Sequence, residues 1–120
     1  MTVQIGNKIL ADRIQPANSF LTRLIGLMGK KELKHNEGLL LFRCSSIHCF
    51  FMRFPIDTVY LSAKMEVLGI ETVKPWRIGH IFRGTKHVLE LPGGFAAEKI
   101  RVGDILVINE IQDGGAFHAG

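Results

Sequence analysis

The sequence is poor in the features that mark several classes of protein. It has 120 residues and only two cysteines, which are too few for a disulfide framework. No apolar stretch approaches the roughly 20 residues that a membrane-spanning helix needs. The N-terminus lacks the basic and apolar regions of a signal peptide, and we find no internal repeat and no linker. We therefore expect a single cytoplasmic domain with reduced thiols and no membrane span.

Common motifs of enzymes and nucleotide-binding proteins are absent as well. The sequence contains no Walker A motif, no G-x-G-x-x-G, no G-x-S-x-G and no H-E-x-x-H. The formal net charge of +4 is mild, so a basic face does not by itself indicate nucleic acid. No RNA-recognition signature is present. We expect no cofactor and no nucleic-acid binding.

Short apolar segments separated by turn residues predict a β-rich domain. We expect strands at 3–5, 8–14, 38–42, 48–53, 57–61, 67–73, 87–91 and 105–109. Pro16 should end the second strand, and Gly69 should mark a bend or bulge in the strand at 67–73. The stretch PGGFAAEKI, residues 92–100, reads as a turn with room for a short helix.

One amphipathic helix is expected near the N-terminal end of the chain. Leu21, Leu24, Ile25 and Met28 recur at helical spacing, which predicts one main helix at about 18–29. The expected fold class is therefore α+β and β-rich, with a mainly antiparallel sheet or small barrel of about seven strands. This single domain should occupy residues 1–111, and the glycine-rich residues 112–120 should form a flexible tail.

The stretch CSSIHCFFMRFPIDTVYL, residues 44–61, gathers many chemically active residue types. Cys44, His48 and Cys49 are soft metal ligands, but their C-x3-H-C spacing is no standard zinc pattern. Neighbouring residues of a strand point to opposite faces, and an extended chain would hold the two cysteines ~17 Å apart unless a turn intervenes. We expect packed, reduced thiols and no metal. A catalytic thiol served by a histidine from elsewhere is the alternative.

Arg53 and Asp57 flank a bend at Pro55 in the same stretch. A proline cannot donate a ladder hydrogen bond and belongs at a strand end or edge. The two charged side chains can pair and pin this bend. The functional alternative is that Arg53 binds an anionic group which Asp57 orients.

Five segments carry a recognisable order of motifs over about residues 3–109. They are GLMGKKEL, GLLLF, CSSIHCFFMRFPIDTVYL, VLELPGG and IRVGDIL. In this order they resemble domain-of-unknown-function family 192, in its M-R-x-P-I-D version rather than its W-M-K-N-T version. The motif positions are Gly26, Leu27, Met28, His48, Met52, Arg53, Pro55, Ile56, Asp57, Glu90, Gly94, Gly103 and Asp104. The resemblance implies a small β-rich α+β domain of bacteria and archaea, and it implies no activity.

The polar motif residues include candidate catalytic groups. His48, Asp57 and Glu90 are the residue types that serve as general acids and bases. Glu90 lies in a predicted strand, where we expect it to face outward or to pair with Arg53 or Lys99. Sequence alone does not place these groups at a defined separation.

A basic stretch without any acidic residue runs over residues 72–89. It contains Lys74, Arg77, Arg83, Lys86, the single tryptophan Trp76, and Phe82. We expect a long loop at 74–86, and long loops of this kind are often functional. Basic residues with interleaved aromatics suit phosphates or single strands. The alternative is a solvated loop in which Trp76 plugs the edge of the core.

Three hypotheses for the function follow. The first is a small binding module for an anionic small molecule or an acidic protein partner. Its ligand-binding residues would be Arg53, Asp57, Lys74, Trp76, Arg77, Arg83 and Lys86. The second is a small acid–base enzyme that uses His48 with Asp57 or Glu90. The third is an accessory protein–protein interaction domain. We favour the first, and the oligomeric state stays open.

Overall fold

The computed structural model describes residues 1–17, 36–42, 54–74, 79–80 and 82–109. The elements in this part of the chain are β1 (Thr2–Ile5), β2 (Lys8–Ala11), β3 (Arg13–Ala17), β4 (Glu37–Phe42), β5 (Ile56–Leu61), β6 (Val67–Val73), β7 (His87–Pro92), α2 (Phe95–Lys99) and β8 (Val107–Asn109). Strands dominate these elements, so the fold is β-rich as the sequence predicts.

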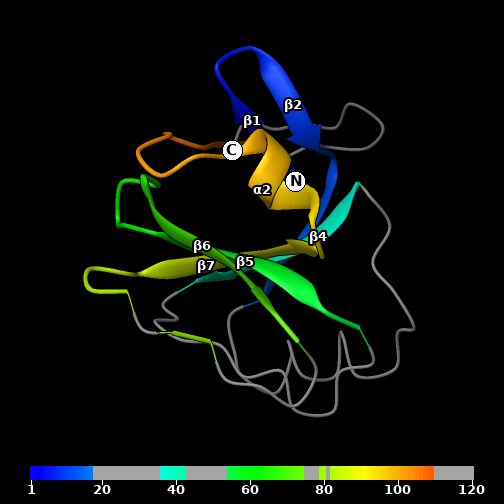
Figure 1. Ribbon diagram of the computed structural model, residues 1–120. Helices are drawn as coiled ribbons and strands as arrows, with labels where there is room; N and C mark the ends of the chain where they lie inside the picture. Colours follow the sequence, from blue (N-terminus) through cyan, green and yellow to red (C-terminus); the bar gives the residue numbers. More distant parts are fainter. Residues whose placement is uncertain (18–35, 43–53, 75–78, 81, 110–120) are drawn as a thin grey trace.

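The strands form two sheets (Figure 1). The larger sheet has the order β3-β4-β7-β5-β6, in which β3 runs parallel to β4 and every other pair is antiparallel. The smaller sheet has the order β2-β1-β8 and is antiparallel throughout. Both orders are linear, so neither sheet closes into a barrel through the strands that the structure describes. Figure 1 shows α2 and the smaller sheet on one side of the larger sheet.

The larger sheet is buried on both faces. Its helix-side face carries Ile14, Leu40, Val59, Leu61, Leu89 and Leu91, which pack with Val3, Ala96 and Ile100. The opposite face, called the loop-side face below, carries Leu39, Leu41, Ile56, Tyr60, Val73 and Val88, with Phe54 and Phe82 against them. Successive strand residues point to opposite faces. A strand covered on both sides therefore reads as a continuous apolar run, as in GLLLF at 38–42.

Two predictions about strand boundaries are wrong. The segment 8–14 is not one strand, because the chain bends at Asp12 and β3 begins at Arg13. Pro16 does not end a strand but lies within β3. Because β3 is an edge strand of the larger sheet, the nitrogen of Pro16, which carries no hydrogen, can face away from β4 without loss of a ladder hydrogen bond.

Two further predictions are confirmed, and three concern residues that the structure does not describe. The pairing of β5 with β6 changes register between Tyr60 and Leu61, next to Gly69, which confirms the expected irregularity there. The short helix α2 forms within PGGFAAEKI. The main helix predicted at 18–29, the strand predicted at 48–53 and the tail at 112–120 lie outside the described residues.

Candidate functional site

Asp57 is a fully buried carboxylate on the helix-side face of β5. Its Oδ1 accepts hydrogen bonds from Thr72 Oγ1 at 2.7 Å and from the Gly94 N–H at 2.9 Å. Its Oδ2 accepts one from the Ala96 N–H at 2.8 Å. Gly94 has a φ of 84°, a left-handed conformation that glycine adopts without strain. All three bonds come from the protein itself, so Asp57 ties the turn before α2 to the sheet.

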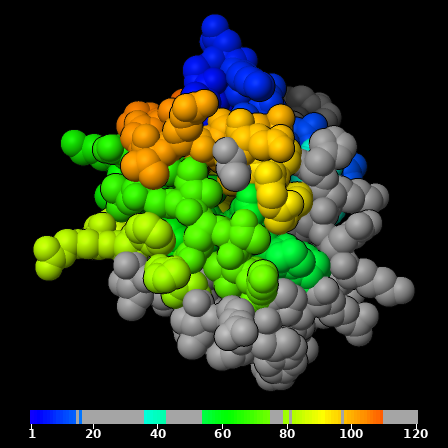
Figure 2. Space-filling model, viewed as in Figure 1, coloured from blue at the N-terminus to red at the C-terminus, as the bar shows by residue number. Residues whose placement is uncertain are grey.

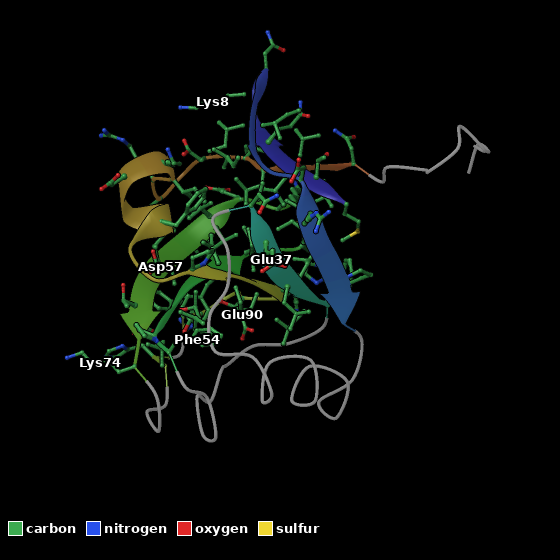
Figure 3. All side chains as sticks on the ribbon, turned by 90° about the vertical axis from the view of Figure 1, so that its right-hand side faces the viewer. Lys8, Glu37, Phe54, Asp57, Lys74 and Glu90 are labelled. Atoms are coloured by element: carbon green, nitrogen blue, oxygen red, sulfur yellow. The ribbon has the colours of Figure 1, made fainter. Side chains whose placement is uncertain are left out.

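Glu90 lies on the opposite, loop-side face and is only 1% exposed. It pairs across the strands with Thr58, the residue that follows Asp57, and successive strand residues alternate between faces. Figure 3 shows Glu90 near Phe54, whereas Asp57 lies nearer to α2. The sheet therefore separates the two carboxylates that the sequence offers as acid–base partners of His48.

The predictions for Glu90 itself are partly answered by this placement. Glu90 does not face outward, because its side chain is buried. Lys99 belongs to α2 on the helix-side face, where its Nζ lies 5.4 Å from the centroid of the Phe95 ring, so it does not pair with Glu90. Pairing with Arg53 stays a prediction, since Arg53 lies outside the described residues. A buried carboxylate is costly without compensating interactions, so we expect neighbouring groups on this face to compensate the Glu90 carboxylate.

A polar row crosses three strands of the loop-side face. Thr58 on β5 pairs with Glu90 on β7 and with Glu71 on β6. Glu71 Oε2 accepts hydrogen bonds from the Tyr60 hydroxyl and from the His80 backbone N–H, both at 2.6 Å. Glu71 Oε1 lies 2.6 Å from His80 Nδ1. One carboxylate thus joins β5, β6 and the loop that follows β6.

These contacts determine the charge state of Glu71. Partial burial raises its pKa, but the hydrogen bonds from Tyr60 and His80 together outweigh burial, and the net pKa lies below the usual value of a glutamate. Glu71 is therefore an anion at neutral pH. Tyr60 is fully buried, and this bond provides a partner for its hydroxyl.

A second contact fixes the loop on β6 through an aromatic ring. The Phe82 ring lies 4.5 Å from the Tyr60 ring, centroid to centroid, at an interplanar angle of 31°. The same ring lies over Gly69, and a Cβ at Gly69 would overlap it. The Phe82 carbonyl accepts hydrogen bonds from Thr85 N at 3.2 Å and Thr85 Oγ1 at 2.7 Å, which close a turn after the ring. The loop is thus seated on the sheet at Phe82 as well as at His80.

The first and last residues of the loop 74–86 lie at opposite ends of β5. At its start, Lys74 follows Val73, which pairs with Ile56 at the beginning of β5. At its end, the Lys86 N–H donates to the Leu61 carbonyl at 2.8 Å, at the other end of β5. Five residue steps of β5 separate these points, or about 17 Å at ~3.4 Å per residue.

Three cations of this loop are exposed to solvent. They are Lys74, Arg83 and Lys86. In the described ranges, no carboxylate lies within ion-pair distance of any of the three. Figure 3 shows Lys74 pointing away from the sheet at the end of β6, and Figure 2 shows yellow-green atoms of the loop projecting from one side of the surface.

Several predicted site residues are not placed by the structure. Cys44, His48, Cys49, Arg53, Trp76 and Arg77 all lie outside the described residues. Within the part of the chain that is described, no three His, Cys, Asp or Glu side chains gather as a metal site. No helix in that part is long and apolar enough to cross a membrane.

Sequence reasoning missed three residues that hold the loop. Glu71, Tyr60 and Gly69 lie on the loop-side face of β5 and β6. Regular counting from the turn at 62–66 would pair Leu61 with Val67 and then Asp57 with Glu71, on the wrong face. Only the change of register between Tyr60 and Leu61 brings Glu71 to the face of Tyr60, and the sequence signals it no further than by the expected irregularity at Gly69.

The described residues define a class: a small β-rich fold of two mostly antiparallel sheets, with the loop residues His80 and Phe82 held on the larger sheet. The family model of domain-of-unknown-function family 192 (DUF192), described as "Uncharacterized ACR", matches residues 1–108. The chain belongs to this family, which confirms the resemblance seen in the five motifs. The description of the family specifies no activity.

Similar proteins support the same assignment. A UPF0127 protein of Pyrococcus furiosus is 33% identical over 103 residues, covering 79% of this chain and 85% of the relative. A UPF0127 protein of Pyrococcus horikoshii is 34% identical over 84 residues, covering 68% of this chain and 73% of the relative. A crystal structure of a protein of unknown function from Novosphingobium aromaticivorans has a TM-score of 0.78 at 24% identity, covering 89% of this chain and 84% of that one. The last likeness concerns the fold alone.

Proposed function

We propose that this domain is a binding module that holds an acidic ligand or partner at the loop 74–86. One observation carries the proposal: Lys74, Arg83 and Lys86 are exposed on a loop that contains no acidic residue of its own. Such cations lose little solvation when they meet an anion at the surface, and they attract it from a distance. Arg77 and Trp76 belong to the same loop and stay predicted contributors.

The way the loop is held also supports binding. Glu71 contacts the loop, and its oxygens are engaged by Tyr60 and by His80. Among the described residues no carboxylate pairs with Lys74, Arg83 or Lys86, so a partner can meet their charges. A loop seated on a sheet loses less conformational entropy on binding than a free one. These two features favour binding over a purely solvated loop.

The acid–base enzyme is the second candidate, and it has less support. Asp57 is engaged by three donors on the helix-side face, and Glu90 lies across the sheet from it. Asp57, one of the residues predicted for this chemistry, is therefore taken up by hydrogen bonds that hold the fold. We retain the predictions of a cytoplasmic location and of no nucleic-acid partner.

A charge-matched pair of variants tests the binding proposal. The loop variant is Lys74→Ala/Arg83→Ala/Lys86→Ala. The control is Lys8→Ala/Lys64→Ala/Arg101→Ala, which also removes two lysines and one arginine from exposed positions. The probe is a fluorescent peptide of ten glutamates, titrated by anisotropy at low and high salt.

We expect the loop variant to bind the probe about tenfold more weakly, and the control to bind within about twofold of the unmodified protein. Binding should weaken as salt is added. Equal weakening in both variants would mean that net charge alone attracts the probe, and the proposal would then be rejected.

A further inference from the structure

We draw no further inference here: the strongest candidate, the exposed apolar surface patch that Ile9 on β2 and Val107 on β8 form across the smaller sheet together with Ile105, carries none, because nothing in the described part of the chain shows what covers it.

Discussion

Replacing Asp57 by asparagine tests the structural role of this carboxylate. The substitution keeps the size and shape of the side chain but exchanges one acceptor oxygen for an NH2 donor. In the native protein both oxygens accept, one from Thr72 and Gly94 and the other from Ala96. Whichever way the amide is turned, at least one of these donors faces another donor at a site that is fully buried.

The magnitude follows from the hydrogen bonds lost. A buried donor without an acceptor costs about 1–3 kcal/mol, and hydrogen bonds to a charged group are worth about 1.5–3 kcal/mol. We therefore expect Asp57→Asn to lower the free energy of unfolding by about 2–5 kcal/mol. The total stability of a domain of this size is typically about 5–15 kcal/mol, so the variant should be conspicuously less stable.

Urea denaturation followed by circular dichroism measures this change. Asp12→Asn is the matched control, because it makes the same chemical change at an exposed carboxylate that accepts one bond, from Asn36 at 3.1 Å. The control should change the free energy of unfolding by less than about 0.5 kcal/mol. A loss of less than about 1 kcal/mol in Asp57→Asn, or equal losses in both variants, would show that the three bonds do not hold the turn before α2.

Three further predictions concern the anchors of the loop. Gly69→Ala should destabilise the protein by about 1–3 kcal/mol, because the added methyl group overlaps the Phe82 ring. In a Phe82→Ala background the same substitution should cost much less stability. An unchanged cost in this double-mutant cycle would exclude the ring as the cause. Tyr60→Phe removes a hydrogen bond to the Glu71 carboxylate, so it should lower the free energy of unfolding in urea by about 1–3 kcal/mol. It should also raise the pKa of Glu71 in an NMR titration, and an unmoved pKa would contradict the contact. Because the pKa of Glu71 is lower in the folded protein than in the unfolded chain, its stabilisation is complete above the unfolded pKa and is lost as the pH falls through the folded one. Glu71→Gln should therefore flatten the acid side of a melting temperature–pH profile, and an unaltered acid side would refute this sign.

The two faces of the larger sheet have different polar chemistry. On the helix-side face, Asp57 binds the turn that precedes α2, a contact internal to the fold. On the loop-side face, Glu90, Thr58 and Glu71 form a row, and Glu71 holds the basic loop. A candidate site is therefore to be sought on the loop-side face and on the loop that Glu71 holds there.

Local features of the sequence were sufficient for the strands and for the character of the loop. The run GLLLF predicts a buried strand because a strand covered on both faces needs no polar residue. The turn at 62–66, where Met65 has a φ of 64°, separates two apolar segments and uses Ser62, whose hydroxyl accepts a hydrogen bond from the Glu66 N–H. The positive charge of the loop follows from composition alone. The run of motifs was enough to predict the family.

Boundaries that depend on position within a sheet were less predictable. Pro16 reads as the end of a strand, because the sequence does not reveal that β3 lies at an edge. Gly69 reads as a bend, and the reason for glycine is also the Phe82 ring, thirteen residues later in the numbering of the chain. Such contacts arise only once the loop folds back on β6.

The sequence by itself determined the β-rich class, most strand positions and the excess of cations at 74–86, because these depend on neighbouring residues and on composition. Only the tertiary structure decided which face each carboxylate occupies and what it meets. Asp57 binds Gly94 and Ala96, which are 37 and 39 residues away along the chain. Glu71 meets His80 because the loop is laid along β6. Cross-strand register and loop path set these contacts, and a one-residue change of register would move each side chain to the other face.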